Sequence, residues 1–181
     1  MVARVSAGLL LFRRRNNPDA AGGPAPTGGV EGASRPEARG LEVLIALPGG
    51  PFFARRDDGW WSVPKGEHEP EEEALSAASR EFAEELGSPP PGGERIDLGS
   101  VTQRGGKLVH VWAVEGDLDT STVVSNEFEL EWPPRSGSLR RFPEIARAEW
   151  VSAAQARRKL LPAQVPFVDR LEALLRERDG P

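Results

Sequence analysis

The hydrophobic pattern of the chain begins with two strand-like runs separated by a segment of different composition. Residues 4–13 (RVSAGLLLFR) and the run from Leu41 (LEVLIALPGG) are short, apolar and free of helix-capping signals, so we expect them to pair as strands. The segment between them, at about 16–40, is rich in Gly, Pro, Ala and Ser and poor in side chains that could pack. It predicts a flexible insertion within a single domain spanning residues 1–181.

A helical period follows the segment 59–66 (GWWSVPKG), which itself predicts a strand that enters a tight loop. We expect the helix to begin at about Pro70, because proline suits the first turn and the dipole there favours the negative charge of residues 71–73. Apolar residues at spacings of three and four predict its buried stripe: Leu75, Ala78, Phe82 and Leu86. Gly87 is expected to end the helix, since glycine tolerates a left-handed backbone.

The pattern after this helix predicts further strands and two closing helices. RIDLGSVTQ and KLVHVWAVEGD flank a turn at 104–106, an arrangement typical of a hairpin. Residues 123–131 (VVSNEFELE) predict another strand or strand edge, ended by WPPRSG, and RAEWVS near Trp150 predicts the last strand. AAQARRKLL and PFVDRLEALLRER, divided by Pro162 and Pro166, predict the helices.

Composition and charge exclude several kinds of site and disfavour several kinds of partner. The 181 residues suffice for one domain with a hydrophobic core, and the absence of cysteine excludes disulfides, iron–sulfur clusters, thiolate zinc sites and cysteine nucleophiles. Because only His68 and His110 remain as nitrogen ligands, we expect any metal to be hard and oxygen-bound. The net charge of -5 disfavours a duplex nucleic-acid partner. The opening apolar run is too short to span a membrane, so we expect a cytoplasmic protein with no membrane partner.

Three carboxylates, Glu81, Glu84 and Glu85, share one face in the last turns of the predicted helix. The helix dipole disfavours negative charge at this end, and like charges at this spacing repel one another. Bound Mg²⁺ or Mn²⁺ would offset both effects, because these ions take carboxylate oxygens as ligands. The alternative is a solvated helix face on which Arg80 softens the repulsion.

The surroundings of these glutamates match a known motif. The charged and glycine positions of GEHEPEEEALSAASREFAEELG have the spacing of that motif: Gly66, Glu72, Arg80, Glu81, Glu84, Glu85 and Gly87. The segment resembles the Nudix box, with Phe82 at the apolar position and Ser88 as the single departure, at a final position that concerns packing.

The resemblance implies a Nudix hydrolase with an α+β fold, an α/β/α sandwich in which the loop-helix-loop of the box and C-terminal helices flank a mixed β-sheet. It implies that water cleaves a pyrophosphate bond in a nucleoside diphosphate linked to another group, with help from Mg²⁺ or Mn²⁺. The implied metal ligands are Glu81, Glu84, Glu85 and the carbonyl of Gly66. The implied role of Arg80 and Glu72 is an ion pair that orients this cluster.

Hydrolysis also requires a carboxylate to accept the proton of the attacking water. Glu81 is our first choice for this general base. A glutamate outside the box is the alternative, from the acidic run Glu127, Glu129 and Glu131.

Candidate substrate contacts lie outside the helix. Lys65 directly precedes the box, and Arg55 and Arg56 lie in a predicted loop where they could meet phosphate oxygens. Trp132, followed by two prolines and Arg135, is the least core-like aromatic residue and could stack on a base. The alternatives are solubilising surface charges and an aromatic residue that simply packs.

The substrate itself is predicted only as a class of small nucleotide-type pyrophosphates. The PKGE lead-in is similar to that of dinucleoside-polyphosphate and diphosphoinositol-polyphosphate hydrolases, which favours a highly phosphorylated compound. The segments GGPFFARRDDGWWSVPKGE and SNEFELEWPPRSG also resemble an uncharacterised bacterial Nudix subgroup, which supplies no substrate.

Two other functions stay open. One is a non-catalytic Nudix-fold sensor that binds a nucleotide, although such modules commonly lose a box glutamate and this chain keeps them all. The other is a house-cleaning triphosphatase for damaged nucleotides, which differs only in substrate. The sequence also leaves open the phosphorus attacked, the number of metal ions and whether the chain forms a homodimer.

Overall fold

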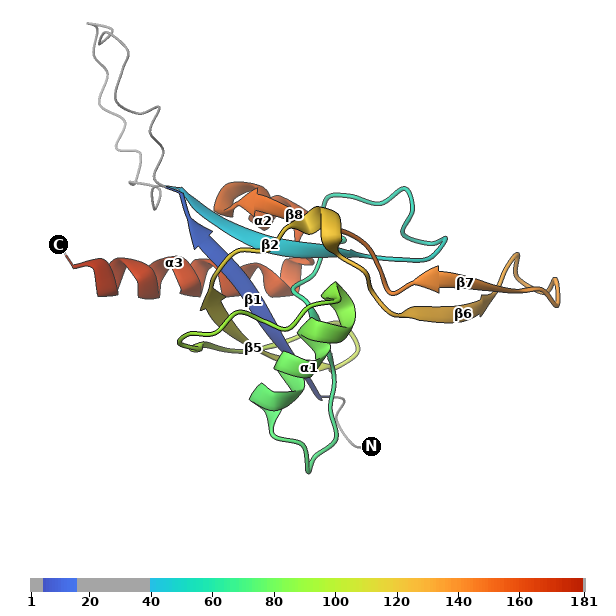
Figure 1. Ribbon diagram of the computed structural model, residues 1–181, viewed down its shortest axis with the longest axis horizontal. Helices are drawn as coiled ribbons and strands as arrows, with labels where there is room; N and C mark the ends of the chain where they lie inside the picture. The colour runs from blue at the N-terminus through green and yellow to red at the C-terminus, as the bar shows by residue number, and fades with distance from the viewer. Residues whose placement is uncertain (1–4, 16–39, 181) are drawn as a thin grey trace, which may run out of the picture.

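The apolar amino-terminal run becomes the central strand of a mixed sheet. The computed structural model describes residues 5–15 and 40–180, so nearly all of the predicted insertion at 16–40 lies outside the described residues (Figure 1). The single-domain prediction for 1–181 stays a prediction. In chain order the elements are β1 (Val5–Arg14), β2 (Leu41–Pro48), β3 (Lys65–Glu67), α1 (Ala74–Leu86), β4 (Ile96–Thr102), β5 (Leu108–Glu115), the 3-10 helix η2 (Thr120–Thr122), β6 (Glu127–Glu131), β7 (Leu139–Pro143), β8 (Ile145–Ser152), α2 (Ala153–Lys159), the 3-10 helix η3 (Pro162–Gln164) and α3 (Val165–Asp179).

The six-stranded main sheet has the order β4-β5-β1-β2-β8, with β3 also paired to β1. As predicted, the two apolar runs pair: β1 and β2 are antiparallel, while β1 and β5 are parallel. The short strand β3 pairs antiparallel with Ser6–Gly8 of β1. Because β1 is buried without interruption from Ser6 to Phe12, it needs cover on both faces.

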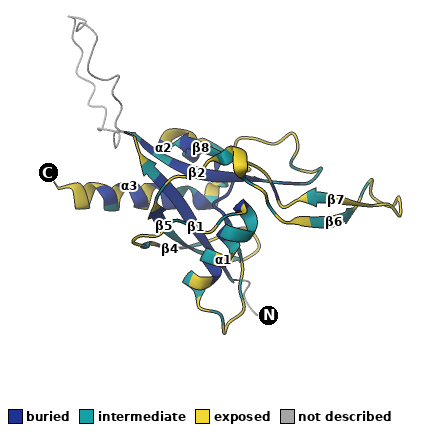
Figure 2. Cartoon of the chain, in the orientation of Figure 1, coloured by how far each residue is buried: buried dark blue, intermediate teal, exposed yellow. Residues whose placement is uncertain are grey.

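Helices supply this cover from both sides (Figures 1 and 2). On one face, Phe82 of α1 packs in a cluster with Leu9 and Leu44 of the sheet. On the other face, α2 and α3 enclose a larger cluster that includes Leu10 of β1 and Phe167 of α3. The α+β fold, an α/β/α sandwich with a mixed sheet, is therefore confirmed.

The helix α1 begins at Ala74, four residues later than predicted. Glu73 is extended and its carboxylate accepts hydrogen bonds from the backbone amides of Leu75 and Ser76, at 3.1 and 2.7 Å. This side chain caps the helix, so the acidic residues 71–73 precede the first turn and do not lie within it. The buried stripe also shifts, because Leu75 is only partly buried; the buried residues are Ala77, Ala78, Phe82 and Leu86.

Other predicted elements need smaller corrections. The segment 59–66 forms isolated bridges at Trp61 and Ser62 before β3 begins, in place of the predicted strand. The β4–β5 hairpin, the strand β8 and the helices α2 and α3 are confirmed, but Pro166 lies in the first turn of α3 and does not divide the helices.

The predicted strand at 123–131 is shorter, at Glu127–Glu131, and does not join the main sheet. It pairs with β7 in a two-stranded ribbon that projects from the body of the molecule (Figure 1). Of the residues described, none belongs to a helix with both the length and the apolar character needed to cross a bilayer.

The carboxyl end of α1 offers a test of this packing. Gly87 has the predicted left-handed backbone, with φ of 75°, and a Cβ there would lie 2.5 Å from the carbonyl oxygen of Val124. We expect Gly87→Ala to lower the free energy of unfolding by at least about 1–2 kcal/mol, measured by urea denaturation. Gly92→Ala is the matched control, since nothing lies within 4 Å of its Cβ position. Equal losses in the two variants would contradict this account of the helix end.

Candidate active site

Strand pairing places the glycine of the box against the helix α1. Gly66 lies in β3, where it is the register partner of Ala7 in the central strand β1. A Cβ at Gly66 would overlap the carboxylate of Glu81. Glycine is therefore required for close contact between β3 and the acidic face of α1.

Arg80 donates hydrogen bonds to three carboxylates of the acidic cluster. Its Nε and Nη2 donate to the two carboxylate oxygens of Glu72, each at 3.0 Å, in a bidentate ion pair. Its Nη1 donates to Glu81 Oε1 at 2.6 Å and to Glu84 Oε2 at 3.2 Å. The hydrogen bond from Arg80 lowers the pKa of Glu72. Two of the three glutamates implied as metal ligands, Glu81 and Glu84, thus converge on a single guanidinium nitrogen.

Glu85 is held apart from Arg80 in a largely buried position. Burial raises its pKa to about 7, while the nearby charge of Lys65 and the hydrogen bond from the Lys65 amide lower it. That amide donates to Glu85 Oε2 at 3.0 Å. Burial in turn lowers the pKa of the Lys65 ammonium, and the carboxylate of Glu85 raises it. A fully solvated helix face does not describe this cluster, since the Glu81 side chain is also only 15% exposed.

The cluster has the donor atoms of a hard-cation site, although these atoms do not surround a common point. Within the residues described, no three His, Asp or Glu side chains are arranged so that they could hold a metal ion. The available donors are all oxygens, as Mg²⁺ and Mn²⁺ prefer. Glu81 and Glu84 already direct oxygens at one nitrogen of Arg80, so a cation in its place would meet both carboxylates. The residues therefore fit such an ion, provided that Arg80 withdraws from these two contacts.

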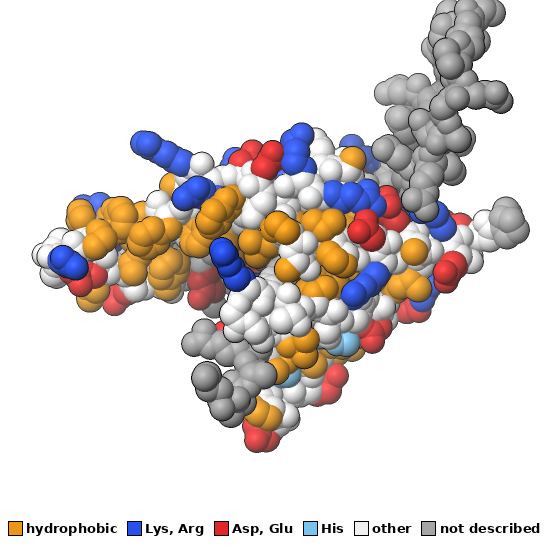
Figure 3. Space-filling view, turned by 180° about the vertical axis from the view of Figure 1, so that it is seen from behind, with side chains coloured by type: hydrophobic (Ala, Val, Ile, Leu, Met, Phe, Trp, Pro, Cys, Tyr) orange, Lys and Arg blue, Asp and Glu red, His pale blue; other side chains and the backbone are white. Residues whose placement is uncertain are grey.

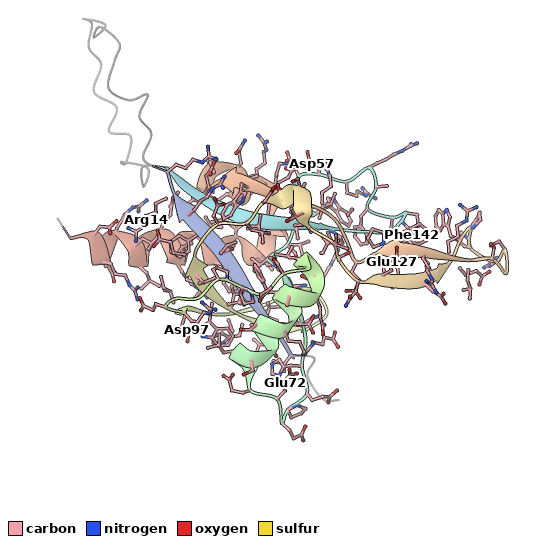
Figure 4. The ribbon with its side chains drawn as sticks, viewed as in Figure 1. Arg14, Asp57, Glu72, Asp97, Glu127 and Phe142 are labelled. Carbon is pink, nitrogen blue, oxygen red and sulfur yellow. The ribbon has the colours of Figure 1, made fainter. Side chains whose placement is uncertain are left out.

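The predicted substrate residues are divided among three places. Lys65 lies in β3 beside the cluster. Arg55 and Arg56 lie in the loop after β2, where the Arg56 guanidinium covers the Trp60 ring at 4.5 Å. Trp132 and Arg135 lie in the turn of the β6–β7 ribbon and are not brought to the acidic cluster. In Figure 4, Glu72 lies beside α1, whereas Glu127 and Phe142 lie on the ribbon.

Sequence reasoning missed Glu144, the residue between β7 and β8. Its carboxylate is close enough to raise the pKa of Glu85. Its backbone amide donates to the carbonyl of Asn126 at 2.8 Å, and its carbonyl accepts from the amide of Gly49, also at 2.8 Å. No local pattern marks Glu144 in FPEIARAEW, because only the sheet topology brings this junction to α1.

Of the acidic residues of β6, which were our alternative general bases, Glu129 and Glu131 have partners on the ribbon itself. Glu129 accepts a hydrogen bond from Arg141 at 3.2 Å, and Glu131 accepts one from the amide of Gly137 at 2.9 Å. Glu144, whose charge acts on Glu85, is therefore better placed than Glu129 or Glu131. A second cation also lies near the cluster: the Lys107 ammonium donates to Glu67 at 3.1 Å and lowers the pKa of Lys65.

Comparisons with known proteins identify the family and the fold. A family model described as the NUDIX domain matches residues 49–171, which include the whole box. No curated protein matches the chain.

Several solved structures share the fold. A C. elegans Ap4A hydrolase binary complex has a TM-score of 0.57 and 18% identity, over 94% of this chain and 97% of that one. The NUDIX domain of Shewanella oneidensis NrtR, complexed with ADP ribose, has a TM-score of 0.56 and 14% identity, over 97% and 90%. A mutT/nudix family protein from Listeria innocua has a TM-score of 0.56 and 14% identity, over 97% and 96%. The chain therefore belongs to the Nudix family, with the α+β fold and the pyrophosphohydrolase class that its box predicts.

Proposed function

We propose that the chain uses Mg²⁺ or Mn²⁺ to hydrolyse a pyrophosphate bond in a nucleoside diphosphate linked to another group. The observation that carries the proposal is the convergence of Glu81 and Glu84 on one nitrogen of Arg80, beside Gly66 and the largely buried Glu85. Such concentrated negative charge is costly without a cation and suits one that arrives with a phosphorylated substrate.

The residues of the proposed site have different roles, which follow from their positions. Glu81, Glu84, Glu85 and the carbonyl of Gly66 would hold the cation. When bound, the cation neutralises pyrophosphate charge and lowers the pKa of a water ligand. Glu72 would keep Arg80 in place, through two hydrogen bonds that involve none of the other box glutamates.

A carboxylate must still accept the proton of the attacking water. Glu81 remains a candidate because it lies directly over Gly66. Glu144 replaces the β6 glutamates as the candidate outside the box, since its charge acts directly on Glu85.

The cations beside the cluster support a highly phosphorylated substrate. Lys65 is partly buried next to Glu85, and the charge of Lys107 acts on Lys65. Two ammonium groups could bind oxygens of a phosphate chain that extends past the cleaved bond. A dinucleoside polyphosphate is therefore the first substrate to test.

A Mg²⁺-dependent phosphate-release screen tests the proposal. The panel comprises dinucleoside polyphosphates, nucleotide sugars, ADP-ribose, NADH and oxidised triphosphates. Turnover of the oxidised triphosphates alone would favour a house-cleaning triphosphatase. No turnover across the panel would favour a nucleotide-binding sensor over an enzyme.

Removal of one metal-binding carboxylate should abolish turnover without unfolding the protein. We expect Glu85→Gln to lower kcat by orders of magnitude, because it removes a charged ligand from the cation, as measured with the best substrate of the screen. Glu71→Gln is the control, since Glu71 is exposed and precedes the helix. Undiminished activity in Glu85→Gln would reject the site assignment.

The buried carboxylate should also make the metal-free protein sensitive to pH. The pKa of Glu85 is about 7 in the folded state, against an ordinary value of 4.5. Between these values the folded state binds more protons than the unfolded state, so the contribution of Glu85 to stability falls as pH rises, by about 3 kcal/mol at full effect. We expect metal-free protein to have a lower Tm at about pH 8 than at about pH 5, and Mg²⁺ to raise the Tm at the higher pH.

Glu85→Gln is also the control for this pH dependence, since it removes the titrating group and keeps a similar shape. The variant should show a smaller Tm difference between the two pH values and a smaller response to Mg²⁺. A difference as large as in the unmodified protein would show that another group is responsible.

The two candidates for the general base can be separated. If Glu144 accepts the proton, Glu144→Gln should lower kcat by about 100-fold or more and remove the acidic limb of the pH–rate profile. Glu129→Gln, on the ribbon, should leave kcat unchanged. An unaltered kcat and pH profile in Glu144→Gln would assign the role to Glu81.

A further inference from the structure

The β6–β7 ribbon has one aromatic face and one acidic face. The strand register pairs Phe128 with Phe142, whose ring centroids are 6.1 Å apart, and Leu130 with Arg140. Trp132 directly follows β6 and lies on the same side, since the loop after β2 contacts both Trp132 and Phe128. The opposite face carries the glutamates of β6: Glu127, Glu129 and Glu131. The aromatic side chains of the ribbon are thus concentrated on one side of a sheet with only two strands.

The loop after β2 packs against this aromatic face. The Phe52 ring meets the Trp132 ring edge-on, with centroids 5.3 Å apart, and Phe128 reaches to 3.1 Å from the Cβ position of Gly50. The neighbouring Phe53 contacts Trp60 instead, at 5.9 Å. Aromatic rings therefore line the junction of loop and ribbon.

One ring of this aromatic surface is open to solvent. Phe52 is 59% exposed, whereas Phe128, Trp132 and Phe142 are partly buried. Figure 3 shows hydrophobic side chains gathered along the projecting ribbon, with Lys and Arg side chains beside them. The loop supplies Arg55 and Arg56, and the ribbon supplies Arg135 and Arg140. Exposed rings next to cations suit a ligand that is both planar and anionic.

Backbone hydrogen bonds join the base of the ribbon to the acidic cluster. The amide of Asn126 donates to the carbonyl of Glu84 in α1 at 3.3 Å. Glu144 then connects Asn126 to Gly49, which begins the loop that carries Phe52. The base of the ribbon and the start of the loop are therefore attached, through the backbone, to the helix that carries the acidic cluster.

We propose that Phe52 and Trp132, with Phe128, bind a planar nucleobase on the part of the substrate that lies beyond the cleaved bond. This proposal rests on the proposed function for the position of the reacting phosphates. Trp132 lies six residues along the chain from Asn126, or roughly 20 Å at about 3.4 Å per residue. A base at Trp132 must be joined to those phosphates by an extended chain, so the site selects a nucleotide with a long polyphosphate linker over a nucleoside triphosphate.

The test compares AMP with ribose 5-phosphate, which share a phosphate and differ in the base. Neither contains a pyrophosphate bond, so titration calorimetry measures binding without turnover. We expect the unmodified chain to bind AMP about tenfold more tightly, since stacking of one base on aromatic side chains commonly gives factors of about 5 to 150. Phe52→Ala should abolish this preference and leave the affinity for ribose 5-phosphate unchanged.

Matched variants separate stacking from general apolar contact. Phe52→Trp should keep the preference for AMP, whereas Phe52→Leu keeps apolar area but lacks a ring and should lose it. Leu139→Ala is the control on the ribbon itself, because Leu139 is 66% exposed and pairs with Glu131 on the acidic face. This control should retain the full preference.

Several outcomes would overturn the nucleobase site. They are equal affinity for AMP and ribose 5-phosphate, no detectable binding of AMP, and a preference that survives Phe52→Ala. Sedimentation adds another: if Phe52→Ala converts a dimer to a monomer without changing AMP affinity, the surface is a contact between two copies of the chain.

The experiments can reject the proposed function and the nucleobase site independently of each other. Phe52-dependent binding of AMP, in a chain that hydrolyses nothing in the panel, would reject the enzyme and retain the nucleobase site. Turnover that depends on Glu85, in a chain with no preference for AMP, would retain the enzyme and reject the nucleobase site.

Discussion

Negative charge gathered at the carboxyl end of α1 is the constraint on which the site depends. The helix dipole, mutual repulsion and partial burial all disfavour Glu81, Glu84 and Glu85 at this position. Arg80 relieves the charge on Glu81 and Glu84 through direct contacts, whereas Glu85 receives only the Lys65 amide and the field of its ammonium. The rest of the local structure supports this cluster: β3 must pair with β1 to deliver that amide, and Gly66 must lack a side chain to let Glu81 approach.

Much of this arrangement could be predicted from the sequence, since its determinants are local or periodic. The short apolar runs of the first two strands predict their pairing, and the spacing of the box predicts which glutamates share a helix face. The start of α1 could not be predicted in the same way. Residues 71–73 all suit a helix amino terminus by charge, and only side-chain geometry decides that Glu73 binds free amides while Glu72 turns toward Arg80.

Contacts between distant segments could not be predicted from the sequence either, for a different reason. Glu144 follows a ribbon strand and precedes β8, so its approach to Glu85 depends on how the whole sheet is assembled. Likewise, alternation in SNEFELEWPP predicts a strand but not its partner. That β6 pairs with β7 outside the main sheet follows from the turn at 132–138 and from the fixed ends of the ribbon at Asn126 and Glu144.

Because Arg80 contacts both Glu81 and Glu84, its ion pair with Glu72 has a role beyond the start of the helix. Under the proposed function, a cation and the Arg80 Nη1 group compete for the same oxygens of Glu81 and Glu84. Without Glu72, a displaced guanidinium would lose every carboxylate partner that the structure gives it, which would oppose metal binding. The bidentate pair with Glu72 uses the other two nitrogens, so Arg80 can yield two carboxylates and remain neutralised. The supporting ion pair would then make the exchange of one cation for another possible, in addition to orienting the cluster.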